Sequence, residues 1–177
     1  MSTIKANAIQ TLAGVDVSNK ILQVINVIKT DTFNTNSTSY AAVPGLSITI
    51  TPKLSSSSIL IIPSIHGNSY NRGGTLQLRR NGSTVSALMP SSAGSRGVTN
   101  IGSLWTGDAA GDGGMVFGRT ITLLDTPATT SATTYAVYAR TDTAVSYGTW
   151  INQSNDDADT SDNARTVSTI TVMEVAA

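Results

Sequence analysis

The sequence predicts an all-β protein of the sandwich or jelly-roll type. Short runs rich in Ile, Val and Thr recur along the chain, and residues that favour turns separate them. In residues 46–51, apolar and hydroxyl side chains alternate strictly, which is typical of a strand with one buried face. We find no convincing helical period, and no repeated blade signature of a β-propeller.

About eight short strands follow from this pattern. The expected strands lie at residues 21–30, 46–51, 59–65, 75–80, 83–85, 120–124, 135–139 and 167–175, with a further short one near Trp105. Polar or Gly-rich loops are expected at residues 90–114, 125–134 and 153–165.

Three strands carry more specific expectations. Residues 59–65 are almost continuously apolar, so we expect a strand buried on both faces, with Pro63 at a bulge or strand end. Asn81-Gly82 favours a type I′ turn that joins two strands into a hairpin. The strand at 135–139 is expected to place its two tyrosines on one face.

The first twenty residues differ from the rest of the chain. Residues 1–20 hold few apolar side chains and several turn residues, so they predict an extended N-terminal arm that does not fold alone. Ile4, Ile9 and Leu12 are the apolar residues by which this arm would attach to a partner. The sequence thus divides into an arm at 1–20 and a β-sandwich domain at 21–177.

Composition narrows the function classes. There are 11 basic and 11 acidic residues, charged residues are only 12% of the chain, and 22 Ser and 26 Thr replace them. The sequence has no basic patch that would predict nucleic-acid binding and no apolar stretch long enough to predict a membrane span. Its first residues do not have the pattern typical of a signal peptide. The absence of Cys excludes disulfides and thiolate sites. A protein surface with so few charges is expected to pack against other subunits of an assembly.

No catalytic, cofactor-binding or metal-binding residue is predicted. His66 is the only histidine and no G-x-S-x-G motif accompanies it, so a hydrogen-bonding residue at a strand end is the better interpretation. Residues 155–162 are rich in Asp and Asn but lack the EF-hand spacing, so a solvated loop is favoured over a calcium site, which stays open.

Three aromatic residues are candidate contact residues. Trp105, Tyr147 and Trp150 lie in or beside expected loops. Aromatic side chains are enriched at protein interfaces, and exposed ones stack on sugar rings. An interface or core role is favoured over ligand binding.

Several segments resemble small virion proteins of tailed bacteriophages, especially those of marine bacteria and cyanobacteria. The resemblance is carried by STIKANAIQ (2–10), KTDTFNTNSTSYAAVPGLSITITP (29–52), ITLLDTPATTSATTYAVYAR (121–140) and STITVMEVA (168–176). It implies a jelly roll of the trimeric, tumour-necrosis-factor-like type, with no functional residue to carry over.

The resemblance also implies a function. We expect a non-enzymatic structural protein of the virion, as a tail fibre, fibre tip or capsid decoration, that forms a homotrimer and contacts other virion proteins. The alternative is a host-attachment module that binds a host-surface glycan or protein. A depolymerase is disfavoured, because most acidic residues cluster in loops without the paired carboxylates of glycosidases.

Overall fold

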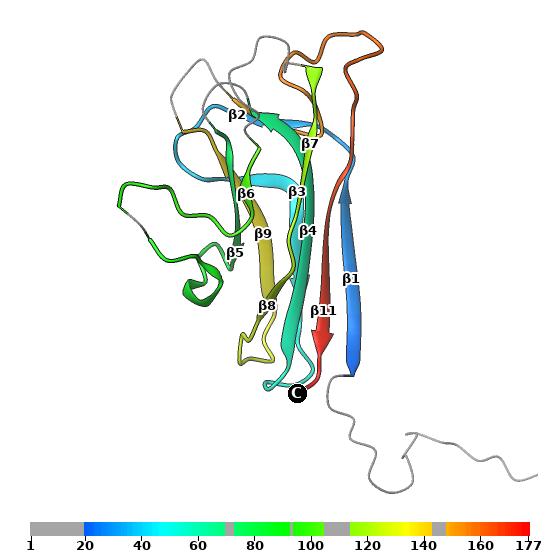
Figure 1. The fold of residues 1–177 in the computed structure, drawn as a ribbon. Coiled ribbons are helices and arrows are strands. Elements are labelled where there is room, and N and C mark those ends of the chain that lie inside the picture. Colours follow the sequence, from blue (N-terminus) through cyan, green and yellow to red (C-terminus); the bar gives the residue numbers. More distant parts are fainter. Residues whose placement is uncertain (1–19, 70–72, 93, 105–113, 143–147) are drawn as a thin grey trace, which may run out of the picture.

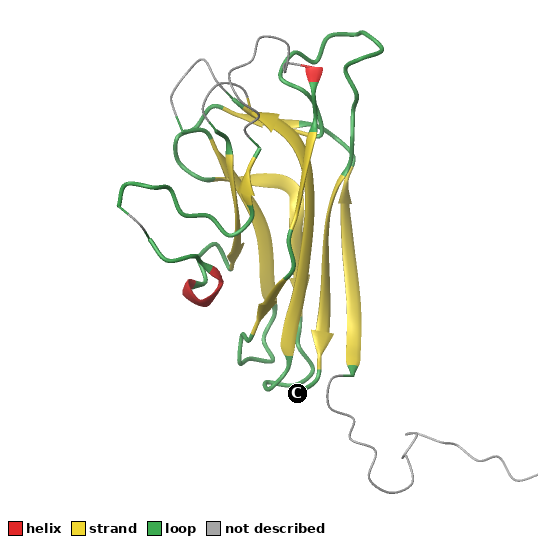
Figure 2. Ribbon diagram, in the orientation of Figure 1, coloured by secondary structure: helices red, strands yellow, loops and turns green. Residues whose placement is uncertain are grey.

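Two antiparallel sheets pack face to face in the computed structural model, which confirms the all-β sandwich (Figure 1). The structure describes residues 20–69, 73–92, 94–104, 114–142 and 148–177. Strands dominate these residues, and η1 (Ser86–Leu88) is a single 3-10 turn (Figure 2).

The larger sheet, sheet A, has the strand order β1, β11, β4, β10, β2, and β7 and β8 also pair with β4. Its strands are β1 (Ile21–Lys29), β2 (Phe33–Thr35), β4 (Ser58–Ser69), β7 (Phe117–Thr120), β8 (Leu123–Asp125), β10 (Thr149–Ile151) and β11 (Ser168–Val175). The smaller sheet, sheet B, has the order β3, β9, β5, β6. Its strands are β3 (Ala41–Ile50), β9 (Thr133–Arg140), β5 (Thr75–Arg80) and β6 (Gly102–Ser103).

The core lies between the two sheets. The alternation predicted for residues 46–51 is confirmed, since Leu46, Ile48 and Ile50 are buried while Ser47 and Thr49 are exposed. Sheet A contributes buried side chains from β4, β10 and β11 to the same cluster: Ile59, Ile61, Ile65, Ile151, Ile170 and Val172. Side chains of period two from both sheets thus fill one apolar layer.

The prediction that β4 is buried on both faces is wrong. Ile59, Ile61 and Ile65 are fully buried in the core, but Leu60 and Ile62 lie on the outer face of sheet A and are only half-buried. The apolar run is explained by an outer face that is itself apolar. Its side chains are only half-buried because no element of the described chain covers them.

The single strand predicted at 120–124 is also wrong, since the chain forms β7 and then β8. Residues 64–67 of β4 pair with β7, residues 59–61 pair with β8, and the pairing is interrupted between them. Pro63 occupies this gap in mid-strand. Proline has no N–H to donate to a ladder, which is a physical reason for an interruption here.

The turn at Asn81-Gly82 is confirmed, but the hairpin is not. Both residues have positive φ, as a type I′ turn requires, and Arg80 and Ser83 exchange two backbone hydrogen bonds of 2.9 Å. Residues 83–85 form no strand beyond this bridge, and the chain continues into η1. Instead, β5 pairs with β9 and β6.

The two tyrosines of β9 lie on opposite faces, so their predicted placement on one face is wrong. Tyr135 is fully buried between the sheets, whereas Tyr138 is half-buried on the outer face of sheet B. Three positions separate them, and side chains in a strand change face at every residue.

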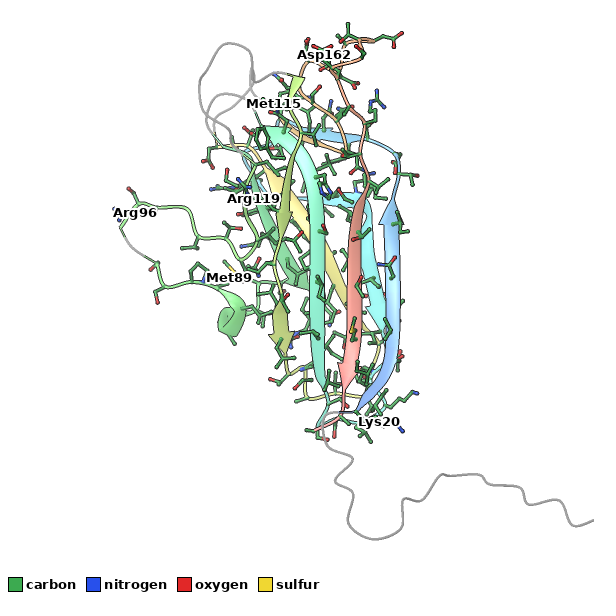
Figure 3. All side chains as sticks on the ribbon, turned by 45° about the vertical axis from the view of Figure 1, so that its right-hand side comes forward. Lys20, Met89, Arg96, Met115, Arg119 and Asp162 are labelled. Carbon is green, nitrogen blue, oxygen red and sulfur yellow. The ribbon has the colours of Figure 1, made fainter. Side chains whose placement is uncertain are left out.

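The two ends of the sandwich differ. The first described residue, Lys20, and the C-terminus lie at one end, where the Ala176 N–H donates to the Lys20 carbonyl at 2.9 Å. The loop that contains Asp162 lies at the other end (Figure 3). Residues 1–19, including Ile4, Ile9 and Leu12, fall outside the described residues.

Candidate functional site

The buried charges of the sandwich form structural contacts. Arg80 Nη1 lies 3.0 and 2.8 Å from the two carboxylate oxygens of Asp125, and the Tyr135 hydroxyl donates to Asp125 Oδ2 at 2.6 Å. Burial, followed by the hydrogen bond to Asp125, raises the pKa of Tyr135. Since Asp125 belongs to β8 and its partners to β5 and β9, this cluster joins the two sheets.

His66 forms hydrogen bonds, as predicted, but it lies within β4 and not at a strand end. Its Nδ1 lies 2.9 Å from the Val167 carbonyl oxygen, and its backbone N–H donates to the Ser168 hydroxyl at 2.9 Å. The Ser168 hydroxyl in turn donates to Asn152 Oδ1 at 2.6 Å. These bonds connect β4 with the start of β11, and no described carboxylate is bonded to this histidine.

The acidic loop at 155–162 is organised by an arginine. Arg165 donates from Nε and Nη2 to the two carboxylate oxygens of Asp157, both at 2.7 Å. A hydrogen bond from the Thr160 hydroxyl lowers the pKa of Asp162. Within the described residues, no group of three or more acidic or histidine side chains converges as a metal site.

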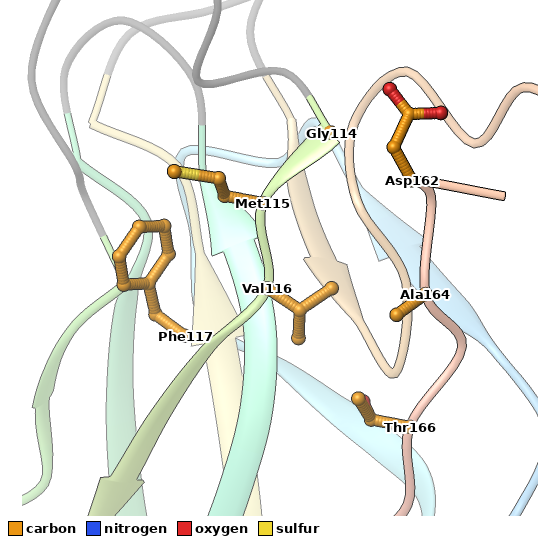
Figure 4. Close-up of a pocket in the computed structure, with 7 residues that line it drawn as sticks. All are labelled: Gly114, Met115, Val116, Phe117, Asp162, Ala164 and Thr166. Atoms are coloured by element: carbon orange, nitrogen blue, oxygen red, sulfur yellow. The ribbon is translucent and has the colours of Figure 1, made fainter.

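A cavity of about 520 Å³ lies beside this loop (Figure 4). It is lined by Gly114, Met115, Val116, Phe117, Asp162, Ala164 and Thr166. Its walls are mainly apolar, and Asp162 and Thr166 are the lining residues with polar side chains.

The outer face of sheet A carries a row of apolar side chains across four strands. In the strand register, Val24 lies opposite Met173, Met173 opposite Leu60, and Leu60 opposite Leu124. Val24 and Leu124 are 56% and 55% exposed, and the two central residues are half-buried. We call these four residues the apolar row.

The polar residues beside the apolar row hydrogen-bond to one another. Asn26 Nδ2 donates to the Thr171 hydroxyl at 2.8 Å, and the hydroxyls of Ser64 and Thr120 lie 2.9 Å apart. On the described outer faces of β1, β11, β4, β7 and β8, no Asp, Glu, Lys or Arg points outward. Burying this surface would therefore leave few polar groups unpaired, which keeps the desolvation cost low.

The aromatic residues singled out in the sequence are not brought together by what the structure describes. Trp150 lies in β10, between β4 and β2, and is half-buried. Trp105 and Tyr147 fall outside the described residues.

Sequence reasoning missed the apolar row. One signal was present in β1, where Val24 and Ile28 are apolar in one phase of the alternation and Ile25 and Val27 in the other. A strand that is apolar in both phases has two faces to bury. The partners of Val24 across the sheet could not be read from the pattern.

No model of a protein family matches the chain, and no curated protein matches it. In the described part of the chain, no helix is long and apolar enough to cross a membrane.

Proposed function

We propose that this chain is a non-enzymatic structural protein that works by self-assembly through the outer face of sheet A. The observation that carries this proposal is the apolar row with its mutually hydrogen-bonded polar neighbours. Large exposed apolar patches on soluble proteins mark interaction sites.

A second copy of the same chain is the partner that this face suits best. A face without charged residues meets its own copy without like-charge repulsion, whereas a strongly charged partner would lose hydration and gain no ion pair. The trimeric state follows the resemblance of the sequence to virion proteins with trimeric jelly rolls. Three copies related by a rotation axis form a closed assembly.

The setting that we propose is a bacteriophage virion, as a tail fibre, fibre tip or capsid decoration. The segments at 2–10, 29–52, 121–140 and 168–176 support this setting by resemblance. Mass spectrometry of purified particles of a phage that encodes the chain tests it directly: the protein should be a constituent, and its absence from the particles would contradict the proposal.

Light scattering of the purified protein tests the assembly. We expect a mass about three times the 18.3 kDa of one chain. Leu124→Asp places a charge in the apolar row and should shift the mass to that of one chain, with the β-type circular dichroism spectrum retained because Leu124 is already exposed.

Leu54→Asp is the matched control. Leu54 is also an exposed leucine, 45% accessible, but it lies outside the apolar row, so this substitution should leave the trimer intact. A wild-type protein with the mass of one chain would refute self-assembly. Equal masses for the two variants would refute the role of this face.

A further inference from the structure

Two arginines and two tyrosines gather on the outer face of sheet B. The guanidinium carbon of Arg79 lies 5.0 Å from the centre of the Tyr40 ring and 4.6 Å from that of Tyr138. The guanidinium carbon of Arg140 lies 5.2 Å from the centre of the same Tyr40 ring. We call these four residues the arginine–tyrosine cluster. All four side chains are half-buried, so they are partly desolvated but accessible.

The cluster carries a positive charge that no described residue neutralises. Arg80, the neighbour of Arg79 in β5, is paired with Asp125 on the other side of the strand. Arg140 has a carboxylate 3.1 Å away on Asp142. Arg79 forms no ion pair with any described residue, and its contacts are with rings and neutral oxygens.

The guanidinium of Arg79 is held in one orientation. Its Nε donates to Gln77 Oε1 at 2.8 Å, and its Nη1 lies 3.5 Å from the Gly82 carbonyl oxygen. Gln77 is itself only 3% exposed, with Nε2 3.8 Å from the Met89 sulfur. No described residue hydrogen-bonds to Arg79 Nη2. A fixed guanidinium with a free edge is a preorganised receptor for a planar anion, and a carboxylate matches its fork.

The surroundings of the cluster favour a sugar. The Thr75 hydroxyl accepts hydrogen bonds from Arg140 Nε at 3.0 Å and from the Tyr40 hydroxyl at 3.3 Å. Across the sheet, Ala42 lies opposite Tyr138, and Ser47 lies opposite Ala136. The neighbouring surface is therefore made of small side chains and hydroxyls, which suit a ring bearing hydroxyl groups better than an apolar peptide side chain.

We propose that the arginine–tyrosine cluster binds the carboxylate of an acidic saccharide, such as a uronic acid residue in a polysaccharide. Sheet B faces away from the apolar row, so assembly through sheet A leaves the cluster accessible. Binding here does not depend on the oligomeric state or on the virion setting, and it can succeed or fail separately from them.

Isothermal titration of the full-length protein with an alginate tetrasaccharide tests the proposal. We expect binding of this uronate, no binding of the neutral maltotetraose, and no binding of triglutamate, which presents carboxylates on a peptide. Absence of uronate binding would overturn the proposal. Equal binding of maltotetraose or triglutamate would overturn it as well, because the carboxylate or the sugar would then play no part.

Two substitutions should act in opposite directions. Arg79→Gln removes a charge-assisted pair and should weaken uronate binding at least about tenfold. Asp142→Asn removes the carboxylate that competes for Arg140 and should tighten it. A merely structural cluster would not produce a gain from Asp142→Asn, so an unchanged or weaker affinity in this variant contradicts the proposal even if Arg79→Gln proves unstable.

Arg165→Gln is the control for charge. Arg165 is exposed and paired with Asp157, away from sheet B, so the same loss of one positive charge should leave the affinity unchanged. Equal weakening by Arg79→Gln and Arg165→Gln would indicate attraction by net charge alone and would overturn the assignment of the site.

Discussion

At the scale of single residues, a buried carboxylate ties a loop to the sandwich. Glu174 points inward from β11 and is fully buried. Its oxygens accept hydrogen bonds from Gln23 Nε2 at 2.6 Å and from the backbone N–H groups of Lys53 and Leu54 at 2.7 and 3.2 Å. Burial alone would raise the pKa of Glu174, but the nearby Ser57 hydroxyl and the hydrogen bonds from Gln23, Lys53 and Leu54 together lower it.

This arrangement gives an expected pH dependence. The pKa of Glu174 is lower in the folded than in the unfolded chain, so its stabilising effect is complete above the ordinary Glu pKa of about 4.3 and is lost as the pH falls through the folded value. We expect Glu174→Gln to lower the unfolding free energy at pH 7 by about 1–3 kcal/mol. In this variant the unfolding free energy should also decrease less steeply as the pH falls below about 4.3. Urea unfolding across this pH range measures both effects.

Asp156→Asn is the control, because Asp156 lies exposed in the acidic loop. It should leave unchanged both the unfolding free energy at pH 7 and the decrease of this free energy at acid pH. If the unfolding free energy of the two variants decreases equally at acid pH, Glu174 is not a source of the pH dependence.

At the scale of elements, the close approach of β4 and β10 depends on a glycine. Gly67 lies opposite Ile151 in the strand register. A Cβ at Gly67 would overlap the Trp150 carbonyl oxygen and would lie 3.1 Å from Leu104 Cδ1. The overlap is with backbone, so a side-chain rotation cannot relieve it.

We therefore expect Gly67→Ala to destabilise the fold. Overpacking of this kind costs about 1–3 kcal/mol or more, which in a chain of this size lowers the melting temperature by at least about 2 °C. Gly97→Ala serves as the control, because its new Cβ would meet only the flexible end of Arg140. A thermal melt of Gly67→Ala that matches Gly97→Ala would show that β4 and β10 separate readily.

At the scale of the whole molecule, the two ends of the sandwich carry different features. Lys20 and Ala176 are hydrogen-bonded to each other at one end, and the acidic loop lies at the far end. The core cluster and the partly buried residues packed against it begin at Ile25. This polarity suits a module that is attached at the Lys20 end and presents its loops at the other.

Deleting residues 2–19 tests the attachment arm, since the truncation keeps the Lys20 carbonyl that bonds to Ala176. The melting temperature of the module should change by no more than about 1 °C, because the described core is retained. Incorporation into phage particles, measured by mass spectrometry, should be lost. Unfolding of the truncated protein, or normal incorporation, would contradict the role of residues 1–20 as an arm.

Local sequence patterns were enough to predict the class of fold and several local features. Alternation at residues 46–51 predicted the buried face of β3, and Asn81-Gly82 predicted a turn with two positive φ values. These features depend on neighbours in the chain, through side-chain period and backbone sterics, so they can be read locally.

The two surfaces could not be predicted in this way, because each is formed by strands that are distant in the sequence. The apolar row joins Val24, Leu60, Leu124 and Met173, and the arginine–tyrosine cluster joins Tyr40 to β5 and β9. Non-local pairing also explains why β7 and β8 are separate strands and why residues 83–85 form no strand. Strand partners and register are set by how the two sheets pack together, and periodicity within one strand carries no information on which strand lies beside it.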